Sequence, residues 1–225
     1  MSSVKLISHT MGAGELVGKS PQDIITYTAR VSNPHNQEAF HTAAGLLKYC
    51  IKHEHWSIFE TASMTVEINT TRGIAAQVLR HRSFTFQEFS QRYADPNLLD
   101  IAINLPDLRR QDTKNRQSSH SDLPPGMVED YQKKIKAHFE EGLHLYNMLV
   151  DNSVAKECAR FVLPLATSTR IYMTGSCRNW IHYINLRSQE ATQREHRVVA
   201  LQCRKVFEEV FPDVAAACKE LGQGD

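Results

Sequence analysis

The densest run of side chains that could do chemistry is RHRSFTFQEFSQRY, residues 80–93. It combines guanidinium groups, an imidazole, a carboxylate and hydroxyls with interleaved aromatic rings. Arg binds phosphates and carboxylates in a forked geometry, and an aromatic ring beside it suits a planar ligand. A solvated, basic helix end is the ordinary alternative for a short Arg-His-Arg sequence. Because the polar run continues for fourteen positions, we favour a binding site for a planar anionic ligand.

A helix is expected to carry the first of these side chains. Thr71 can cap it, and its apolar positions continue to about His81. On that helix Gln77, Arg80 and His81 stand at i, i+3 and i+4 and would share one face. The helix would therefore present an amide, a guanidinium and an imidazole together.

An extended segment is expected to carry the rest. In such a segment Glu88, Ser90 and Arg92 alternate onto one side. The end of the helix and this strand could then line one wall of a pocket. Ser90 has no evident His and Asp partners in the sequence, so we expect it to hydrogen-bond a substrate rather than attack it.

The surrounding pattern predicts a single, mostly helical α+β domain over residues 1–225, with a small sheet. Ser153 is expected to cap one of its helices, and the polar stretch 107–122 is expected to be a surface loop. We expect strands at 4–7, 64–68 and 171–174, and further helices at about 21–31, 38–53, 125–151, 153–163, 178–186 and 192–210.

Composition limits the possible partners. The chain has 225 residues and a formal net charge of +1, which argues against the broad basic surface that nucleic acids require. Its five cysteines are odd in number and lack a C-x-x-C spacing, which indicates a reducing, intracellular compartment. We expect no signal peptide, no membrane span and no metal, since His53 and His55 have no third ligand at a suitable spacing.

These residues resemble the flavin-dependent thymidylate synthase family. Members carry Arg-His-Arg, seven residues and then Ser, which here are Arg80-His81-Arg82 and Ser90, with Arg92 two positions later. Three further segments are similar to family elements: EHWSIFET (54–61), AKECARFVLP (155–164) and TGSCRNWIHYINLR (174–187). No cysteine stands in the Pro-Cys-His context expected of the cysteine-dependent enzyme.

The resemblance implies a role for each matching residue. Arg187 would be catalytic, because it matches the Arg credited with ionising N3 of the uracil ring. This chain departs from the family at Ser176, where Asn is usual. The implied dUMP contacts are Gln77, Arg80, Glu88, Ser90, Gln91, Arg92, Arg160 and Arg187. The implied FAD contacts are His55, Ser57, Arg80, His81, Arg82, Ser83, Glu88, Ser176, Arg178 and His182.

The resemblance also implies the reaction and the assembly. FAD would carry the hydride, NADPH would be the reductant, and methylenetetrahydrofolate would give the carbon that turns dUMP into dTMP. A homotetramer with active sites at subunit junctions is implied as well. On a straight helix Arg178 and Arg187 fall about 180° apart. Either the helix breaks between them, or they serve two sites across a subunit interface.

Two other classes of function fit parts of the pattern. An RNA-binding module could use the aromatic and Arg-rich run, although the near-neutral charge weighs against it. A catalytically silent homologue could keep the fold, although the intact Arg and Ser positions weigh against that.

Overall fold

The chain divides into two compact units whose segments alternate along the sequence. The computed structural model describes residues 2–99 and 104–222. The first unit consists of Met1–Ser2, Asn69–Leu79 and Glu88–Ile171, and the second of Ser3–Ile68, Arg80–Gln87 and Tyr172–Asp225. The expectation of a mostly helical α+β fold is confirmed, and one domain over 1–225 stays a prediction.

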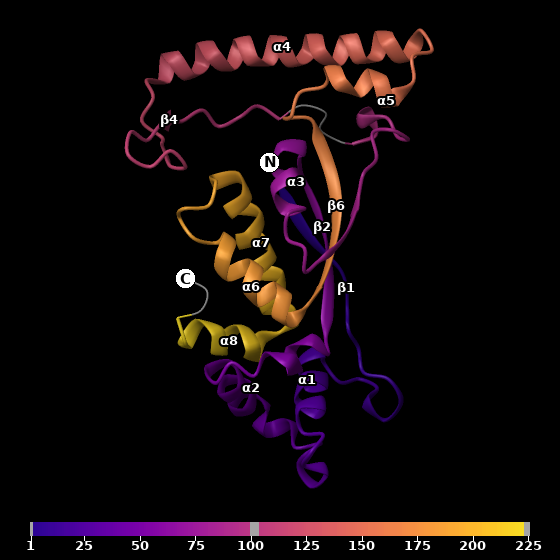
Figure 1. Cartoon of the computed structure of the whole chain (residues 1–225), viewed down its shortest axis with the longest axis vertical. Coiled ribbons are helices and arrows are strands. Elements are labelled where there is room, and N and C mark those ends of the chain that lie inside the picture. Colours follow the sequence, from indigo (N-terminus) through magenta and orange to yellow (C-terminus); the bar gives the residue numbers. More distant parts are fainter. Residues whose placement is uncertain (1, 100–103, 223–225) are drawn as a thin grey trace. The chain divides into compact units, whose positions relative to one another are not determined.

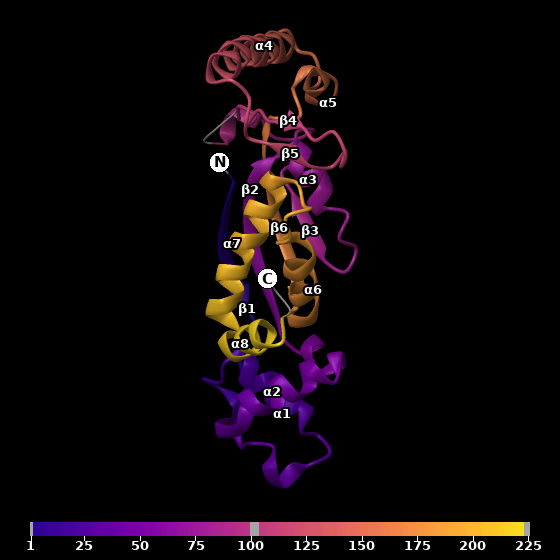
Figure 2. The same cartoon turned by 90° about the vertical axis from the view of Figure 1, so that its left-hand side faces the viewer.

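The sheet has four strands in the order β1-β2-β6-β3, and all four are labelled in the second of the two views (Figures 1 and 2). In β2 the alternate side chains Met64, Val66 and Ile68 are buried, as a strand with one face on a core requires. All three predicted strands exist, and each is longer than expected. The bounds are Ser3–His9 for β1, Ser63–Thr71 for β2, Thr85–Glu88 for β3 and Ser168–Ser176 for β6.

Three C-terminal helices complete the second unit: α6 (Cys177–Arg187), α7 (Arg194–Val210) and α8 (Pro212–Glu220). The helices α6 and α7 pack on each other, and α7 also packs on β1 (Figures 1 and 2). The expected helix ending at Val210 is confirmed, but α8 was not predicted. Pro212 explains α8, because proline cannot continue a helix and suits the first turn of a new one.

The N-terminal helices of the same unit begin at local signals. Ser20 and Asp23 form a capping box for α1 (Pro21–Ala29), which ends slightly before the predicted position. The helix predicted from residue 38 starts later, because a 3-10 turn precedes α2 (Ala43–Lys52). The 3-10 helices are η1 (Gly14–Leu16), η2 (Pro34–Asn36), η3 (Phe40–Thr42), η4 (Trp56–Glu60), η5 (Pro96–Leu98) and η6 (Arg160–Val162).

The first unit contains α3 (Arg72–Val78), the long α4 (Pro125–Asp151) and α5 (Lys156–Ala159). Thr71 caps α3 by accepting a hydrogen bond from the backbone of Ile74, as predicted. Ser153 does not cap α5. Its φ is +65°, and Ala155 is the N-cap.

The stretch 107–122 is not a plain loop, because β4 (Arg110–Gln111) pairs antiparallel with β5 (Ser119–His120). The Asp112 carboxylate accepts hydrogen bonds from the backbone of Lys114 and Asn115 in the connecting turn. These contacts between near neighbours stabilise a hairpin. The hairpin was not predicted, because residues 107–122 have no repeating pattern of apolar side chains.

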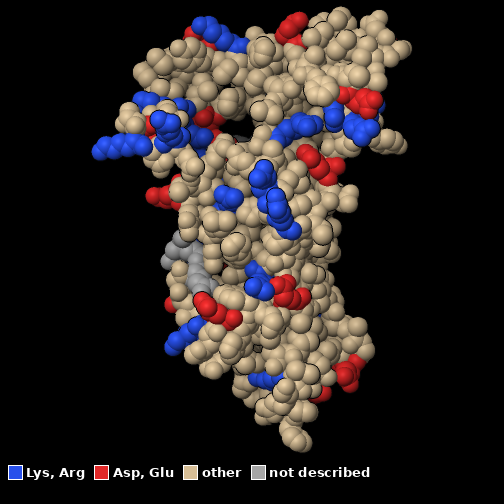
Figure 3. All heavy atoms as spheres, in the orientation of Figure 1, with Lys and Arg blue, Asp and Glu red and all other residues tan. Residues whose placement is uncertain are grey.

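Charged side chains of both signs lie on the surface. On the face drawn in Figure 3, Lys and Arg side chains are interspersed with Asp and Glu. Within residues 2–99 and 104–222, no helix is long and apolar enough to cross a membrane. In the same part of the chain, no group of three or more potential metal ligands occurs.

Candidate active site

The Arg-His-Arg segment follows a helix rather than lying on it. α3 ends at Val78, and the Leu79 N–H bonds back to Ala75 as its C-cap. Arg80 and His81 are therefore outside the helix, and the prediction that they share its face with Gln77 is wrong. The two arginines Arg80 and Arg82 are exposed while His81 is buried, so the segment turns its imidazole inward.

Phe84 anchors this segment in the core of the second unit. Its ring is 4.8 Å from that of Trp180 and is 6% exposed. Gly175 in β6 makes room for it, because a Cβ at Gly175 would lie 2.5 Å from the Phe84 ring. Asn179 adds a hydrogen bond from its Nδ2 to the Ser83 carbonyl, 2.7 Å away. The segment is thus held from two sides.

The extended segment ends at Glu88, so the predicted alternation of Glu88, Ser90 and Arg92 is wrong beyond its first residue. The Ser90 carbonyl accepts hydrogen bonds from the backbone of Tyr93 and Ala94, at 3.1 and 2.9 Å, which closes a turn. Such a turn directs consecutive side chains in different directions.

That turn belongs to the first unit and is fixed by several contacts. The Thr169 hydroxyl donates to Glu88 at 3.1 Å, and Arg72 donates to the Gln91 side-chain oxygen. Gln91 is 2% exposed, and its Nε2 has no hydrogen-bond partner among the described residues. A buried amide donor of this kind is suited to a ligand acceptor. No local pattern predicted a role for Arg72, since its partner lies 19 positions away.

Two arginines of the first unit that were predicted to contact dUMP have protein neighbours in this structure. Arg92 forms an exposed ion pair with Glu157, with 3.2 Å between Nη2 and the carboxylate. Arg160 lies over the ring of Phe161 at 5.6 Å and is half-buried. Because an exposed ion pair is worth little, an anionic ligand can replace Glu157 at low cost.

The second unit contains an open groove of about 610 Å³. It gathers three segments that are far apart in the sequence, and three of the predicted flavin contacts: Ser83, Arg178 and His182. His55, Ser57, Arg82 and Ser176 belong to the same unit but are not among its lining residues. The full lining is Trp56, Glu60, Ser83, Arg178, Asn179, Ile181, His182 and Asn185.

Glu60 organises one end of the groove. Its carboxylate accepts hydrogen bonds from the Ser176 hydroxyl at 2.5 Å and from Arg178 at 3.2 Å. The Ser176 oxygen also caps α6 by accepting from the Asn179 backbone. Ser176 therefore holds Arg178 and the helix start in place. Glu60 was quoted as part of a family segment, but no role was assigned to it.

His81 contacts the predicted catalytic arginine. Arg187 Nε donates to His81 Nε2 at 2.9 Å, and the His81 ring meets Tyr183 edge-on at 4.8 Å. Burial, aided by the nearby Arg187 and His182, lowers the pKa of His81 to about 4. His81 is therefore neutral near pH 7 and can accept this hydrogen bond.

The helix α6 is continuous from Cys177 to Arg187, so it does not break between the two arginines. Arg178 pairs with Glu60 and Arg187 with His81, in agreement with side chains about 180° apart. The angular separation of Arg178 and Arg187 was explained above either by a break in the helix or by service in two sites. The first explanation is wrong.

We expect the protein to lose stability in acid because two of its histidines, His81 and His196, are buried. Burial is also the main cause that lowers the pKa of His196 to about 4. An unfolded histidine titrates near 6.5, so between about pH 6.5 and 4 the unfolded chain binds more protons than the folded one. We expect the free energy of unfolding to fall by about 2–3 kcal/mol per histidine over that range. Urea unfolding measured at several pH values checks this, and a flat profile from pH 7 to 4 would contradict it.

Comparison with known proteins gives consistent relatives. The family described as "Thymidylate synthase complementing protein" matches residues 5–213. A probable flavin-dependent thymidylate synthase of Paramecium bursaria Chlorella virus 1 is 51% identical over 218 residues, covering 96% of this chain and 98% of that protein. A flavin-dependent thymidylate synthase of Synechocystis sp. is 48% identical over 198 residues, covering 88% and 89%. The crystal structure of a UMP/dUMP methylase, PolB from Streptomyces cacaoi, bound with 5-Br UMP, superposes with a TM-score of 0.84 at 25% identity, covering 100% of this chain and 96% of that one.

Proposed function

Because the chain belongs to the flavin-dependent thymidylate synthase family, we propose that it converts dUMP to dTMP by reductive methylation, with methylenetetrahydrofolate, FAD and NADPH. The groove of the second unit carries the proposal. It brings Ser83 of the signature segment beside Arg178 and His182 of α6, although these residues are about a hundred positions apart. The family relatives named above are described as enzymes of this class, and the chain is an enzyme of the same family.

The side chains that line the groove are of the kinds that bind the diphosphate and the planar ring of FAD. Arg178 and His182 stand one helical turn apart on α6 and offer donors to a diphosphate. Trp56 offers an aromatic face for a planar ring. The Ser83 and Asn179 side chains add neutral hydrogen-bonding groups. A flavin held here, once reduced by NADPH, would supply the hydride that completes the methyl group. We propose that Arg80, His55, Ser57, Arg82, Glu88 and Ser176 complete this site, whereas the buried His81 is considered separately below.

The turn after β3 would bind the nucleotide. The free Nε2 of Gln91 supplies a buried donor, and Ser90 supplies a hydroxyl. Arg92 can exchange Glu157 for the phosphate, since that ion pair is exposed. We propose that Gln77, Arg80, Glu88 and Arg160 contribute the remaining contacts to dUMP.

Arg187 would act on the pyrimidine. C5 of uracil is a poor nucleophile until negative charge develops on the ring. A guanidinium at the N3–C4 edge stabilises that charge electrostatically, and it remains protonated at any working pH. With its Nε bonded to His81, Arg187 keeps its two terminal nitrogens for the ring.

We propose that the enzyme is a homotetramer with active sites at subunit junctions. The unbroken helix α6 supports this, because its two arginines face opposite sides and would serve two different sites. Sedimentation of the purified protein tests the assembly, and a monomer that turns over dUMP would contradict it.

The function is tested by tritium release from 5-tritiated dUMP, with FAD, NADPH and methylenetetrahydrofolate supplied together and then omitted one at a time. Release that requires both the flavin and the reductant is the expected result. Absence of release from a folded protein that binds FAD would contradict the substrate. Absence of both release and FAD binding would contradict the whole proposal.

Ser90→Ala is expected to keep measurable turnover. The exchange removes one hydrogen bond, worth about 0.5–1.5 kcal/mol, and therefore lowers kcat/KM by roughly 3-fold to 10-fold. Steady-state assays of dTMP formation check it. Complete loss in Ser90→Ala, together with a covalent adduct on Ser90 in the unmodified enzyme, would contradict this role.

A further inference from the structure

His81 is distinguished from its two neighbours by burial. It is 9% exposed, whereas Arg80 and Arg82 are exposed. The groove that fits the flavin is lined by Ser83 but not by His81. The His81 ring instead meets Tyr183 at 4.8 Å and His196 at 6.1 Å, both edge-on. Its surroundings are thus the interior of the second unit.

The only described side chain to which His81 is hydrogen-bonded is Arg187. The acceptor is Nε2, 2.9 Å from Arg187 Nε, so the imidazole carries its proton on Nδ1. A guanidinium is a rigid plane, and fixing its Nε leaves rotation only about that bond direction. Arg187 is also the last residue of α6, where the backbone alone does not hold a long side chain in one orientation.

We propose that His81 is a positioning residue for Arg187, whose side-chain plane it sets by accepting a hydrogen bond from Nε. This inference rests on the proposed function, in which Arg187 acts on the pyrimidine. The histidine of the Arg-His-Arg signature then acts on the nucleotide reaction through Arg187. Its ring is not a flavin contact.

The layer behind His81 keeps the ring in place. Tyr183 and His196 are fully buried, and the Tyr183 hydroxyl lies 3.2 Å from His196 Nε2. Besides Tyr183, the charged or titratable groups near His81 are Arg187, His182 and His196. Arg187 and His182 disfavour protonation of His81, and His81 disfavours protonation of His196. A neutral acceptor is therefore maintained beside the guanidinium.

Two amide variants separate the acceptor from the bulk of the ring. In His81→Gln the amide oxygen can occupy the place of Nε2, whereas in His81→Asn it reaches only the place of Nδ1. We expect His81→Asn to lower kcat by about 10-fold to 100-fold, and His81→Gln to restore most of it. The Kd for FAD should change less than about 3-fold in both, whereas a lost flavin contact would raise it more. His35→Asn, at an exposed histidine, is the matched control.

Three results would overturn the proposal. The first is a parallel loss of FAD affinity in both variants with kcat unchanged at saturating FAD, which would make His81 a flavin contact. The second is an equal loss of kcat in both variants. The third comes from Arg187→Ala as background: if His81→Asn still lowers the residual turnover there, His81 does not act through Arg187.

The background variant also keeps this proposal separate from the function. Normal turnover in Arg187→Ala alone would contradict the catalytic role of Arg187. If His81→Asn does not fold, the turnover of Arg187→Ala is compared with that of the double variant His81→Gln/Arg187→Ala. Equal turnover of these two supports the proposal, and unequal turnover overturns it.

Discussion

Arg187→Ala is expected to lower kcat for tritium release from dUMP by roughly 10²–10³-fold while the protein stays folded. The charge that develops on the activated ring would have no guanidinium to stabilise it. Removing one donor aimed at a developing anion costs about 2.7–4 kcal/mol of transition-state stabilisation in other enzymes.

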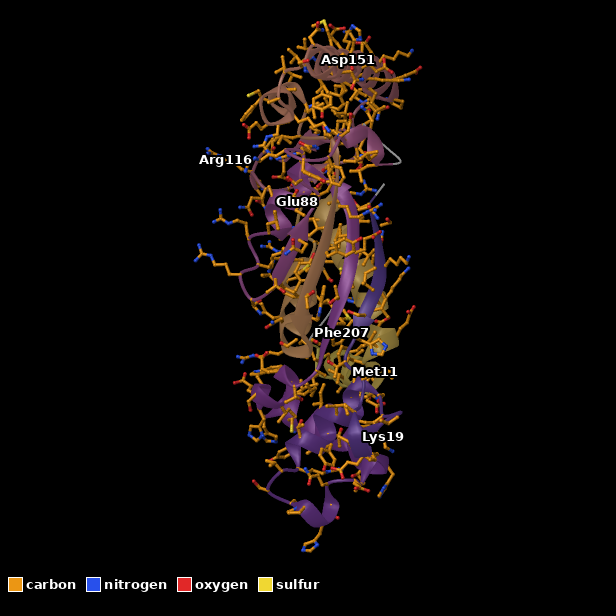
Figure 4. All side chains as sticks on the ribbon, turned by 90° about the vertical axis from the view of Figure 1, so that its right-hand side faces the viewer. Met11, Lys19, Glu88, Arg116, Asp151 and Phe207 are labelled. Carbon is orange, nitrogen blue, oxygen red and sulfur yellow. The ribbon has the colours of Figure 1, made fainter. Side chains whose placement is uncertain are left out.

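Arg116→Ala is the matched control for that variant. Arg116 is exposed, and its side chain points away from the hairpin (Figure 4). We expect its turnover to stay within about 2-fold of the unmodified enzyme, since changes at the surface are usually within ±0.5 kcal/mol. Near-normal turnover in a folded Arg187→Ala protein would contradict the catalytic role.

Trp180→Ala is expected to lower the free energy of unfolding by about 3–5 kcal/mol. Trp180 is fully buried in α6, and its ring contacts Phe84 and Tyr183 at 4.8 and 5.9 Å between ring centroids. Its indole N–H donates to the Met64 carbonyl at 3.2 Å, and the substitution would also remove that hydrogen bond. Denaturation by urea measures the effect.

Trp56→Ala provides the contrast. Trp56 is half-buried in η4 and lines the groove, so its loss should reduce FAD affinity more than stability. A larger loss of stability in Trp56→Ala than in Trp180→Ala would contradict this division. The residue type alone predicts a core or interface position for both tryptophans, and of the two the structure buries only Trp180 fully.

The cysteines show a similar division. A free cysteine is most often a small buried residue, which predicts buried positions for Cys158, Cys177 and Cys203. Cys177 and Cys203 are buried as predicted, and burial raises the pKa of both thiols. Cys158 is exposed, so the prediction is wrong there. It stands on the short helix α5, where no longer apolar pattern defines an inner face.

The features that the sequence determined by itself are local or depend on a long repeat. Ser20 and Thr71 start helices because a side-chain oxygen reaches a backbone N–H three residues ahead. The alternation of Met64, Val66 and Ile68 predicts β2 because a strand has a period of two. The signature residues, taken with the family resemblance, were enough to predict a site around residues 80–93 and 174–187.

Only the tertiary structure decided how those residues are used. The local pattern did not predict that α3 ends at Val78 or that the chain turns at Ser90. The residues that follow and flank these points contact distant segments, as Phe84 does at Trp180 and Glu88 at Thr169. The bond from Arg187 to His81 spans 106 positions, and the one from Arg178 to Glu60 spans 118. Such pairs form where the folded backbone brings two distant side chains together. Local spacing predicts only which side chains share a face of one helix or strand, so it cannot predict these contacts.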